Sequence, residues 1–183
     1  MAKNDKIKTL KVAITGPEST GKTELTRQLS AYFDGTCILE YARKYVESLQ
    51  RPYNYLDVLH IAYKQILESQ GSDLLQTGYV FLDTELIITK VWLELVYGFC
   101  PDWINTAITS SRIDLYLLCN LDIPWIQDKV RENGGEMREK LFHIYEQLIQ
   151  ANGFRYKVIE GTGDLRLRNA LLAIGQFEPN GLN

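Results

Sequence analysis

The sequence predicts an α/β domain with a parallel sheet of five strands, and two observations support this prediction. First, short runs rich in β-branched and aromatic residues alternate with longer stretches of helical period along the 183-residue chain, as in a parallel sheet with crossover helices. Second, a glycine-rich loop, residues 16–23, joins the first of these runs to the first helical stretch. With 45% hydrophobic residues the chain can bury one core, so we expect a single domain over residues 1–183.

The individual elements follow from the spacing of apolar residues. In the first predicted helix, Leu25, Leu29 and Phe33 recur at intervals of four, which places them on one face. The predicted strands cover residues 10–15, 36–40, 79–83, 114–119 and 156–160. The predicted helices cover residues 22–33, about 56–67, 85–97, about 137–148 and 164–177. Right-handed crossovers restrict the topology, but periodicity leaves the order of the strands open.

The loop between the first strand and the first helix has the glycine and lysine spacing of a phosphate-binding loop (P-loop). Its glycines let the backbone bend so that successive N–H groups point at phosphate oxygens, at the N-terminus of a helix. We expect it to bind ATP, with Lys22 reaching the β- and γ-phosphates and the Thr23 hydroxyl binding Mg²⁺. The predicted nucleotide-binding residues are Gly16, Pro17, Glu18, Ser19, Thr20, Gly21, Lys22 and Thr23.

Acidic residues end two of the predicted strands. Glu40 and Asp83 should therefore meet at the carboxyl edge of the sheet, where the phosphate loop also lies. Phosphoryl transfer needs a group that orients or deprotonates the acceptor hydroxyl, and an acid that helps to hold the metal. We expect Asp83 to bind the metal and Glu40 to act on the acceptor, with the reverse assignment left open. Glu85 can share either role.

Residues near these acids are candidates for contact with the acceptor. Tyr41 can stack on a planar ring, and Arg43 lies on the same face as Glu40 if a helix begins at Tyr41. Arg43 can then hold a phosphate, a sugar or Glu40 itself. The predicted substrate-binding residues are Glu40, Tyr41, Arg43, Asp83, Glu85 and Trp125.

Residues 122–135 interrupt the alternating pattern, because they are polar and end in glycines. We expect this segment to form a mobile flap that closes over the site and excludes water. Its interspersed charges include Arg131, which we expect to stabilise the negative charge on the transferred phosphoryl group. Trp125 lies near the start of the flap and can stack on a planar ring.

Composition excludes several other classes of protein. A net charge of −3 and a pI near 5.5 argue against a surface that coats DNA or RNA. The three cysteines form no CxxC pair, so a zinc site or a disulfide framework has no basis. The first residues lack the apolar run of a signal peptide, and no apolar stretch is long enough to cross a bilayer. We expect a cytoplasmic protein that acts on a small molecule, and the sequence leaves its oligomeric state open.

Four segments together resemble the kinase domain of the bifunctional NAD-biosynthesis protein NadR. They read GPESTGKT at 16–23, EYAR at 40–43, FLDTE at 81–85 and DIPW at 122–125. The resemblance extends from about residue 10 to the last predicted helix. It implies the strand order 2-3-1-4-5 of nucleoside and adenylate kinases. It also implies a ribosylnicotinamide kinase, which transfers the γ-phosphate of ATP to the 5′-hydroxyl of nicotinamide riboside and yields nicotinamide mononucleotide and ADP.

The resemblance also implies roles for individual residues: Glu40, Arg43 and Asp83 would line the acceptor site, and Arg131 would be the positively charged residue of the flap. The chain also departs from the family pattern. The bifunctional members carry an adenylyltransferase domain before the kinase, whereas this chain begins within ten residues of its first predicted strand, so we expect kinase activity alone. Lys129 follows Asp128 in the flap, where the family pattern has glycine.

Three alternatives stay open. One is a kinase for another nucleoside. Another is a nucleotide-dependent switch that acts through a protein partner, although the chain has no guanine-specifying NKxD string. The last is a motor-type ATPase, which depends on an arginine from a neighbouring subunit.

Overall fold

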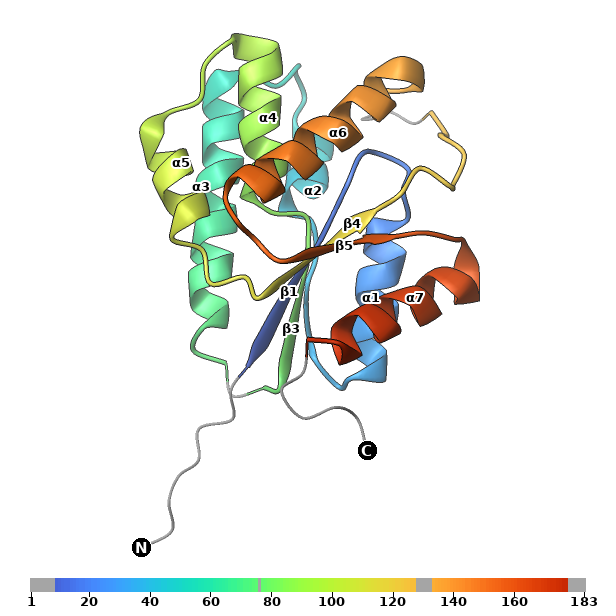
Figure 1. The fold of residues 1–183 in the computed structure, drawn as a ribbon. Helices are drawn as coiled ribbons and strands as arrows, with labels where there is room; N and C mark the ends of the chain where they lie inside the picture. Colours follow the sequence, from blue (N-terminus) through green and yellow to red (C-terminus); the bar gives the residue numbers. More distant parts are fainter. Residues whose placement is uncertain (1–8, 76, 128–132, 178–183) are drawn as a thin grey trace, which may run out of the picture.

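Five parallel strands form the central sheet within residues 9–75, 77–127 and 133–177, the part of the chain that the computed structural model describes (Figure 1). The strands are β1 (Leu10–Thr15), β2 (Thr36–Ile38), β3 (Tyr79–Asp83), β4 (Leu115–Cys119) and β5 (Tyr156–Ile159). Their order is β2-β3-β1-β4-β5, which confirms the order implied by the resemblance. The phosphate loop and the segments that follow β3 and β4 thus leave neighbouring strands at one edge.

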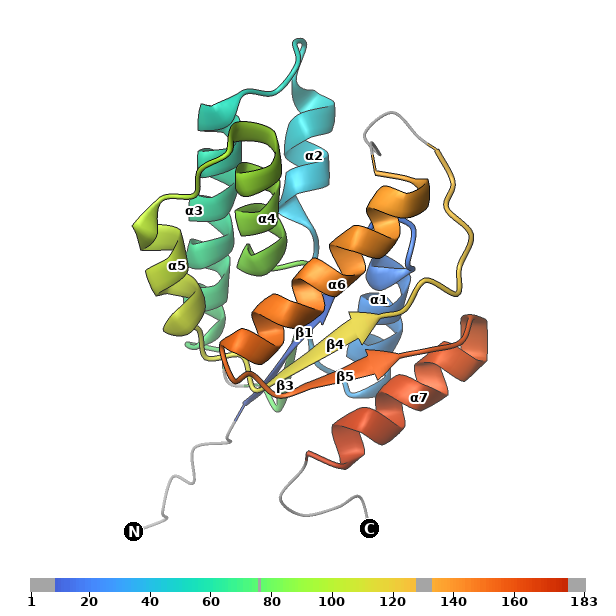
Figure 2. The ribbon, with the colours of Figure 1, turned by 45° about the horizontal axis from the view of Figure 1, so that its top comes forward.

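Seven helices lie in the described part of the chain, and most of them cover the two faces of the sheet (Figures 1 and 2). Helices α1 (Lys22–Tyr32) and α7 (Gly163–Gly175) pack on one face. Helices α3 (Tyr55–Ser72), α4 (Leu86–Tyr97), α5 (Asp102–Thr109) and α6 (Gly135–Ala151) pack on the other. The short α2 (Tyr41–Ser48) lies beside α3. The architecture is therefore three layers, α/β/α.

The strands read as continuous apolar runs because both faces of the sheet are buried. In β1, Val12 and Ile14 pack toward α1 and α7, whereas Ala13 packs toward α4 and α6. In β4, Leu117 packs toward α1 and α7, whereas Tyr116 packs toward α4 and α6. Because successive side chains of a strand point to opposite faces of the sheet, the same strands contribute residues to a hydrophobic core on each face.

The structure corrects some predicted boundaries. The second strand ends at Ile38, where its pairing with β3 ends, so Glu40 does not lie within a strand but directly precedes α2. Helix α5 was not predicted, because it is short and buries only Ile104 and Ile108. The helix predicted over about 56–67 extends over Tyr55–Ser72, and its capping box at Asn54 and Asp57 fixes its start.

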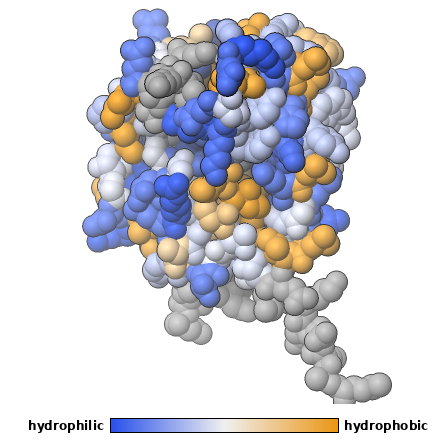
Figure 3. Space-filling model, turned by 180° about the vertical axis from the view of Figure 1, so that it is seen from behind, coloured by the Kyte–Doolittle hydropathy of each residue, from blue (hydrophilic) through white to orange (hydrophobic). Residues whose placement is uncertain are grey.

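The surface opposite to the view of Figure 1 is mostly hydrophilic and carries scattered apolar patches (Figure 3). Among the described residues, no helix combines the length and the apolar character that a membrane span requires.

Candidate nucleotide and acceptor site

The phosphate loop connects the end of β1 to the start of α1, and its glycines are required by its geometry. Gly16 has φ 136°, and a Cβ there would lie 2.9 Å from the backbone oxygen of Cys119. Gly21 has φ 75° and directly precedes α1, where a Cβ would lie 2.8 Å from Cδ1 of Ile123. Both values of φ lie in the region that favours glycine. The loop therefore packs too closely against the segment after β4 for larger residues.

Lys22 lies over this loop. Its Nζ donates hydrogen bonds to the carbonyl oxygens of Gly16 at 2.9 Å and of Pro17 at 2.8 Å. Thr20 closes the turn with a hydrogen bond from Oγ1 to the Pro17 carbonyl at 2.8 Å. Lys22 and Thr23 are the first residues of α1 and are partly exposed, so a positive charge and a hydroxyl group stand at the N-terminus of that helix. This arrangement suits an anion with an attached cation.

Glu18 reaches away from the loop. Its carboxylate accepts hydrogen bonds from Asn133, through N at 3.1 Å and Nδ2 at 3.2 Å, and from Nε1 of Trp125 at 3.5 Å. Both partners belong to the predicted flap, 122–135, so its two ends meet at the phosphate loop. Trp125 accordingly lies beside Glu18 and not among the residues that line the pocket described below. Arg131, the predicted flap cation, lies outside the described residues.

Asp83 ends β3 and is 2% exposed. It pairs with Ile14 of β1, one residue before the end of that strand, which brings it close to the phosphate loop. Neither of its carboxylate oxygens has a hydrogen-bond partner among the residues that the structure describes. The next residue, Thr84, has φ 77°, which is unfavourable for a residue with a branched side chain. Buried unpaired oxygens and backbone strain together are typical of a ligand-binding position.

Glu40 is partly buried and directly precedes α2. Burial raises the pKa of its carboxyl, the nearby Lys22 ammonium opposes this shift, and the Asp83 carboxylate adds to it. This electrostatic influence indicates that Glu40, Lys22 and Asp83 lie near one another. Arg43 also lowers the pKa of Glu40, and its Nε lies 3.8 Å from Oε1 of Glu47.

Glu85 has a role that the sequence did not predict. Its Oε2 accepts a hydrogen bond from the N–H of Ile87 at 2.8 Å and thereby caps α4. Its Oε1 accepts a longer hydrogen bond from Oγ1 of Thr15, at 3.4 Å. Glu85 is 5% exposed, and burial raises its pKa to about 7. Because its carboxylate is engaged in the cap, Glu85 supports the site and is a poor candidate for the metal-binding acid.

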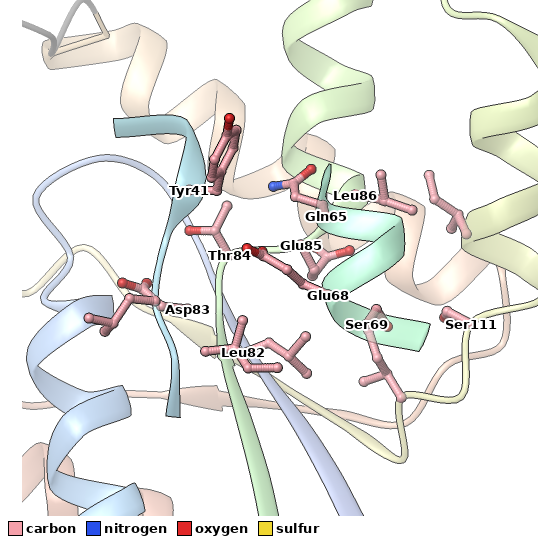
Figure 4. Close-up of a pocket in the computed structure, with 14 residues that line it drawn as sticks. Tyr41, Gln65, Glu68, Ser69, Leu82, Asp83, Thr84, Glu85, Leu86 and Ser111 are labelled. Atoms are coloured by element: carbon pink, nitrogen blue, oxygen red, sulfur yellow. The ribbon is translucent and has the colours of Figure 1, made fainter. Parts of the chain in front are cut away.

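A pocket extends from the ends of β2 and β3 toward α3 and the segment before β4 (Figure 4). Tyr41, Asp83 and Glu85, predicted as site residues, line it, and Figure 4 shows Asp83 on the side toward α1 and Ser111 on the opposite side. Its volume is about 30 Å³, which is room for a few water molecules. A nucleoside-sized acceptor therefore requires the walls of this pocket to separate.

Tyr41 is held by neighbouring aromatic groups. Its hydroxyl lies 2.9 Å from Nε2 of His60, and its ring stacks on that of Tyr45 with centroids 5.7 Å apart. Tyr41 and Asp83 line the same pocket, and Glu40 directly precedes Tyr41.

Two buried arginines lie behind the phosphate loop and were not predicted as site residues, although the sequence contains a signal for them. Arg138 shares the buried stripe of α6 with Leu141 and Tyr145, and Arg166 shares the buried stripe of α7 with Ala170. A charged residue at a core-facing position of a helix requires polar partners inside the protein.

The chain is similar to known proteins in sequence and in fold. The trifunctional NAD biosynthesis/regulator protein NadR of Salmonella typhimurium is 25% identical over 152 residues, which cover 79% of this chain and 37% of that protein. The chain thus spans less than half the length of this curated relative.

Solved structures share the fold. The NadR protein in complex with NR superimposes with a TM-score of 0.75 and 23% identity, over 96% of this chain and 52% of that one. The thymidylate kinase from Ehrlichia chaffeensis gives a TM-score of 0.65 and 15% identity, over 93% of this chain and 99% of the kinase. A family model for an AAA domain, AAA_28, matches residues 11–168. Since this match covers most of the sequence, the chain belongs to the AAA_28 family of AAA domains.

Proposed function

We propose that the protein is an ATP-dependent kinase that phosphorylates the 5′-hydroxyl of nicotinamide riboside to form nicotinamide mononucleotide. The observation that carries this proposal is the cluster of Glu40 and Asp83 beside Lys22 of the phosphate loop. Asp83 also lines a pocket separate from the phosphate loop, and Glu40 directly precedes another residue of that pocket, Tyr41, so the two acids stand where an acceptor could meet the donor. The similarity to NadR supports nicotinamide riboside as the acceptor, because a solved structure of that protein contains NR.

The phosphate loop is the site for the donor. Lys22 would leave the carbonyls of Gly16 and Pro17 and bind the β- and γ-phosphates, and its charge would stabilise the charge that develops during transfer. Because ATP is the donor, we also propose that the protein acts in the cytoplasm.

Thr23 and Asp83 are suited to hold Mg²⁺. A hard cation prefers oxygen ligands, and Asp83 offers two buried oxygens that lack partners among the described residues. Mg²⁺ held by these two residues would neutralise negative charge on the phosphate groups. This assignment leaves Glu40 to act on the acceptor.

Glu40 would accept a hydrogen bond from the 5′-hydroxyl and take its proton as the bond to phosphorus forms. Its raised pKa makes it a better proton acceptor than an ordinary exposed carboxylate. Tyr41 follows it and lines the pocket, so its ring is available to the nicotinamide ring, which is a planar cation. Arg43 would hold the ribose or Glu40, and Arg131 would supply a cation from the flap.

Release of ADP from Mg-ATP, measured with and without nicotinamide riboside and with a panel of other nucleosides, tests the proposal. We expect turnover that depends on the riboside and is lost in Lys22→Ala. Turnover with another nucleoside alone would keep the mechanism and reject the acceptor. Binding of ATP without turnover on any acceptor would reject the kinase and favour a nucleotide-dependent switch.

A further inference from the structure

Two buried arginines hold the outer side of the phosphate loop. Arg138 donates from Nε to the carbonyl oxygen of Glu18 at 3.0 Å and from Nη2 to that of Ser19 at 3.0 Å. Arg166 donates from Nη1 to the carbonyl oxygen of Thr20. Three successive carbonyl groups of the loop thus accept hydrogen bonds from guanidinium groups.

These contacts fix the direction of the N–H groups. In a trans peptide unit the C=O and the following N–H point in opposite directions. Because the carbonyls of Glu18, Ser19 and Thr20 point outward to the arginines, the N–H groups of the next residues point to the other side. We expect phosphate oxygens to bind on that side.

The same arginines join the loop to other segments of the carboxyl edge. Arg138 Nη2 also donates to the carbonyl of Ile123 at 2.7 Å. Arg166 Nη2 donates to the carbonyl of Asn120 at 3.1 Å and to Oδ2 of Asp122 at 3.2 Å. Its Nε donates to the carbonyl of Gly161 at 2.6 Å, and the N–H of Gly161 donates to Oδ2 of Asp122 at 2.8 Å.

Both side chains are almost inaccessible to solvent, at 7% exposure for Arg138 and 3% for Arg166. Burying a guanidinium is unfavourable unless its donors are satisfied, and here backbone carbonyls satisfy most of the donors. A planar fork with five donors can hold several carbonyls at fixed angles, which an ammonium group cannot do. Arginine at these positions therefore fixes the backbone of the loop as well as filling space.

We propose that Arg138 and Arg166 are positioning residues that hold the phosphate loop in its binding conformation and so set the affinity for the phosphate chain of the nucleotide. The role proposed for both arginines is to support the loop through its backbone carbonyl groups, without contact with the nucleotide. This inference rests on nucleotide binding in the proposed function and not on the identity of the acceptor.

Calorimetric titration of Arg138→Gln and Arg166→Gln with Mg-ADP and with inorganic tripolyphosphate tests the inference. We expect the dissociation constant for both probes to rise about tenfold or more, as when a preorganised anion site loses its support. Lys140→Gln and Arg168→Gln are matched controls, because these side chains are exposed on the same two helices. We expect both controls to stay within about twofold of the unmodified protein.

Loss of folding must be separated from loss of positioning. Titrations are made well below the melting temperature of each variant, where a merely structural role leaves affinity unchanged. Arg138→Lys and Arg166→Lys keep the charge, and we expect affinities between those of the glutamine variants and the unmodified protein. In hydrogen–deuterium exchange without nucleotide, amides of residues 18–21 should exchange faster in all four arginine variants.

Folded variants that bind both probes as tightly as the unmodified protein would overturn the inference, as would unchanged exchange at residues 18–21. If the unmodified protein binds Mg-ADP but phosphorylates no acceptor, the proposed function fails while the role of the two arginines stands.

Discussion

The donor side and the acceptor side of the site are held in different ways. On the donor side, Lys22 contacts carbonyl groups of the phosphate loop from within, and Arg138 and Arg166 contact others from behind. On the acceptor side, Asp83 has two buried oxygens without a partner among the described residues, and Glu40 carries a carboxyl with a raised pKa.

This difference indicates which side of the site determines specificity for the substrate. In the proposed reaction the triphosphate of the donor is the same whatever the acceptor, so a loop fixed by many hydrogen bonds suits it. The acceptor is the variable partner, and the pocket of about 30 Å³ would have to widen to admit the proposed nucleoside. The carboxylate of Asp83, which has no hydrogen-bond partner among the described residues, and the short helix α2, which buries only Ala42, allow this side to rearrange around a ligand.

Asp83→Asn is expected to have the largest effect, because Asp83 lies at the junction of the two sides. It keeps the shape of the side chain but removes the charge that would hold Mg²⁺. We expect turnover to fall about a thousandfold, by steady-state kinetics, and the Mg²⁺ concentration for half-maximal activity to rise. A variant with normal activity at low Mg²⁺ would contradict the assignment of Asp83 as a metal ligand.

Glu85→Gln is expected to change how stability depends on pH. The folded state holds the pKa of Glu85 at about 7, above its ordinary value of 4.5, so between these values the unfolded state loses a proton that the folded state keeps. Glu85 therefore lowers the free energy of unfolding as pH rises from about 4.5 to 7, by roughly 3 kcal/mol in all.

Denaturant unfolding at several pH values measures this effect. The glutamine variant should lack this decline, and Glu24→Gln, exposed on α1, should retain it. Parallel pH profiles for the unmodified protein and Glu85→Gln would show that Glu85 is not held neutral by burial.

Glu40→Gln distinguishes the two sides of the site, because it should impair the reaction with the acceptor and leave nucleotide binding unchanged. We expect turnover to fall about a hundredfold, as on removal of a general base, while calorimetry gives an unchanged affinity for Mg-ADP. In the unmodified protein, activity should fall as pH drops through the raised pKa of Glu40, because protonation removes the proton acceptor. An equal loss of Mg-ADP affinity would place Glu40 on the donor side instead.

Tyr41 should give the smallest effect. Tyr41→Ala removes the aromatic face from the pocket, and we expect the KM for nicotinamide riboside to rise about tenfold, as for loss of a cation–π contact. Tyr41→Phe loses only the hydrogen bond to His60 and should change this KM by less than about threefold. Equal effects of the two variants on this KM would show that the hydroxyl of Tyr41, and not its ring, contributes to binding of the riboside.

The donor side was predictable from sequence and the acceptor side only in part, for physical reasons. The phosphate loop is one contiguous segment between a strand and a helix, so its motif specifies its structure locally. The prediction that Glu40 lies in a strand was wrong. The strand β2 lies at the edge of the sheet and pairs only with β3, and this pairing ends at Ile38, before Glu40 is reached. For Glu85 we expected a share in either role of the two acids, and its capping of α4 was not predicted, because the cap depends on a helix start that periodicity locates only approximately.

The phosphate-loop partners of Arg138 and Arg166 lie far from these arginines in the sequence. Arg138 follows Glu18 by 120 residues, and Arg166 follows Thr20 by 146 residues. Periodicity shows that each arginine falls in the buried stripe of its helix, which signals a polar partner. Only the folded chain shows that this partner is the backbone of the phosphate loop.

Detection of the phosphorylated product tests the central claim most directly. Mass spectrometry of a reaction with Mg-ATP and nicotinamide riboside should find nicotinamide mononucleotide in amounts equal to the ADP released, and neither product in Lys22→Ala. Release of ADP with free phosphate and no mononucleotide would contradict the account, because the protein would then hydrolyse ATP without transferring its γ-phosphate.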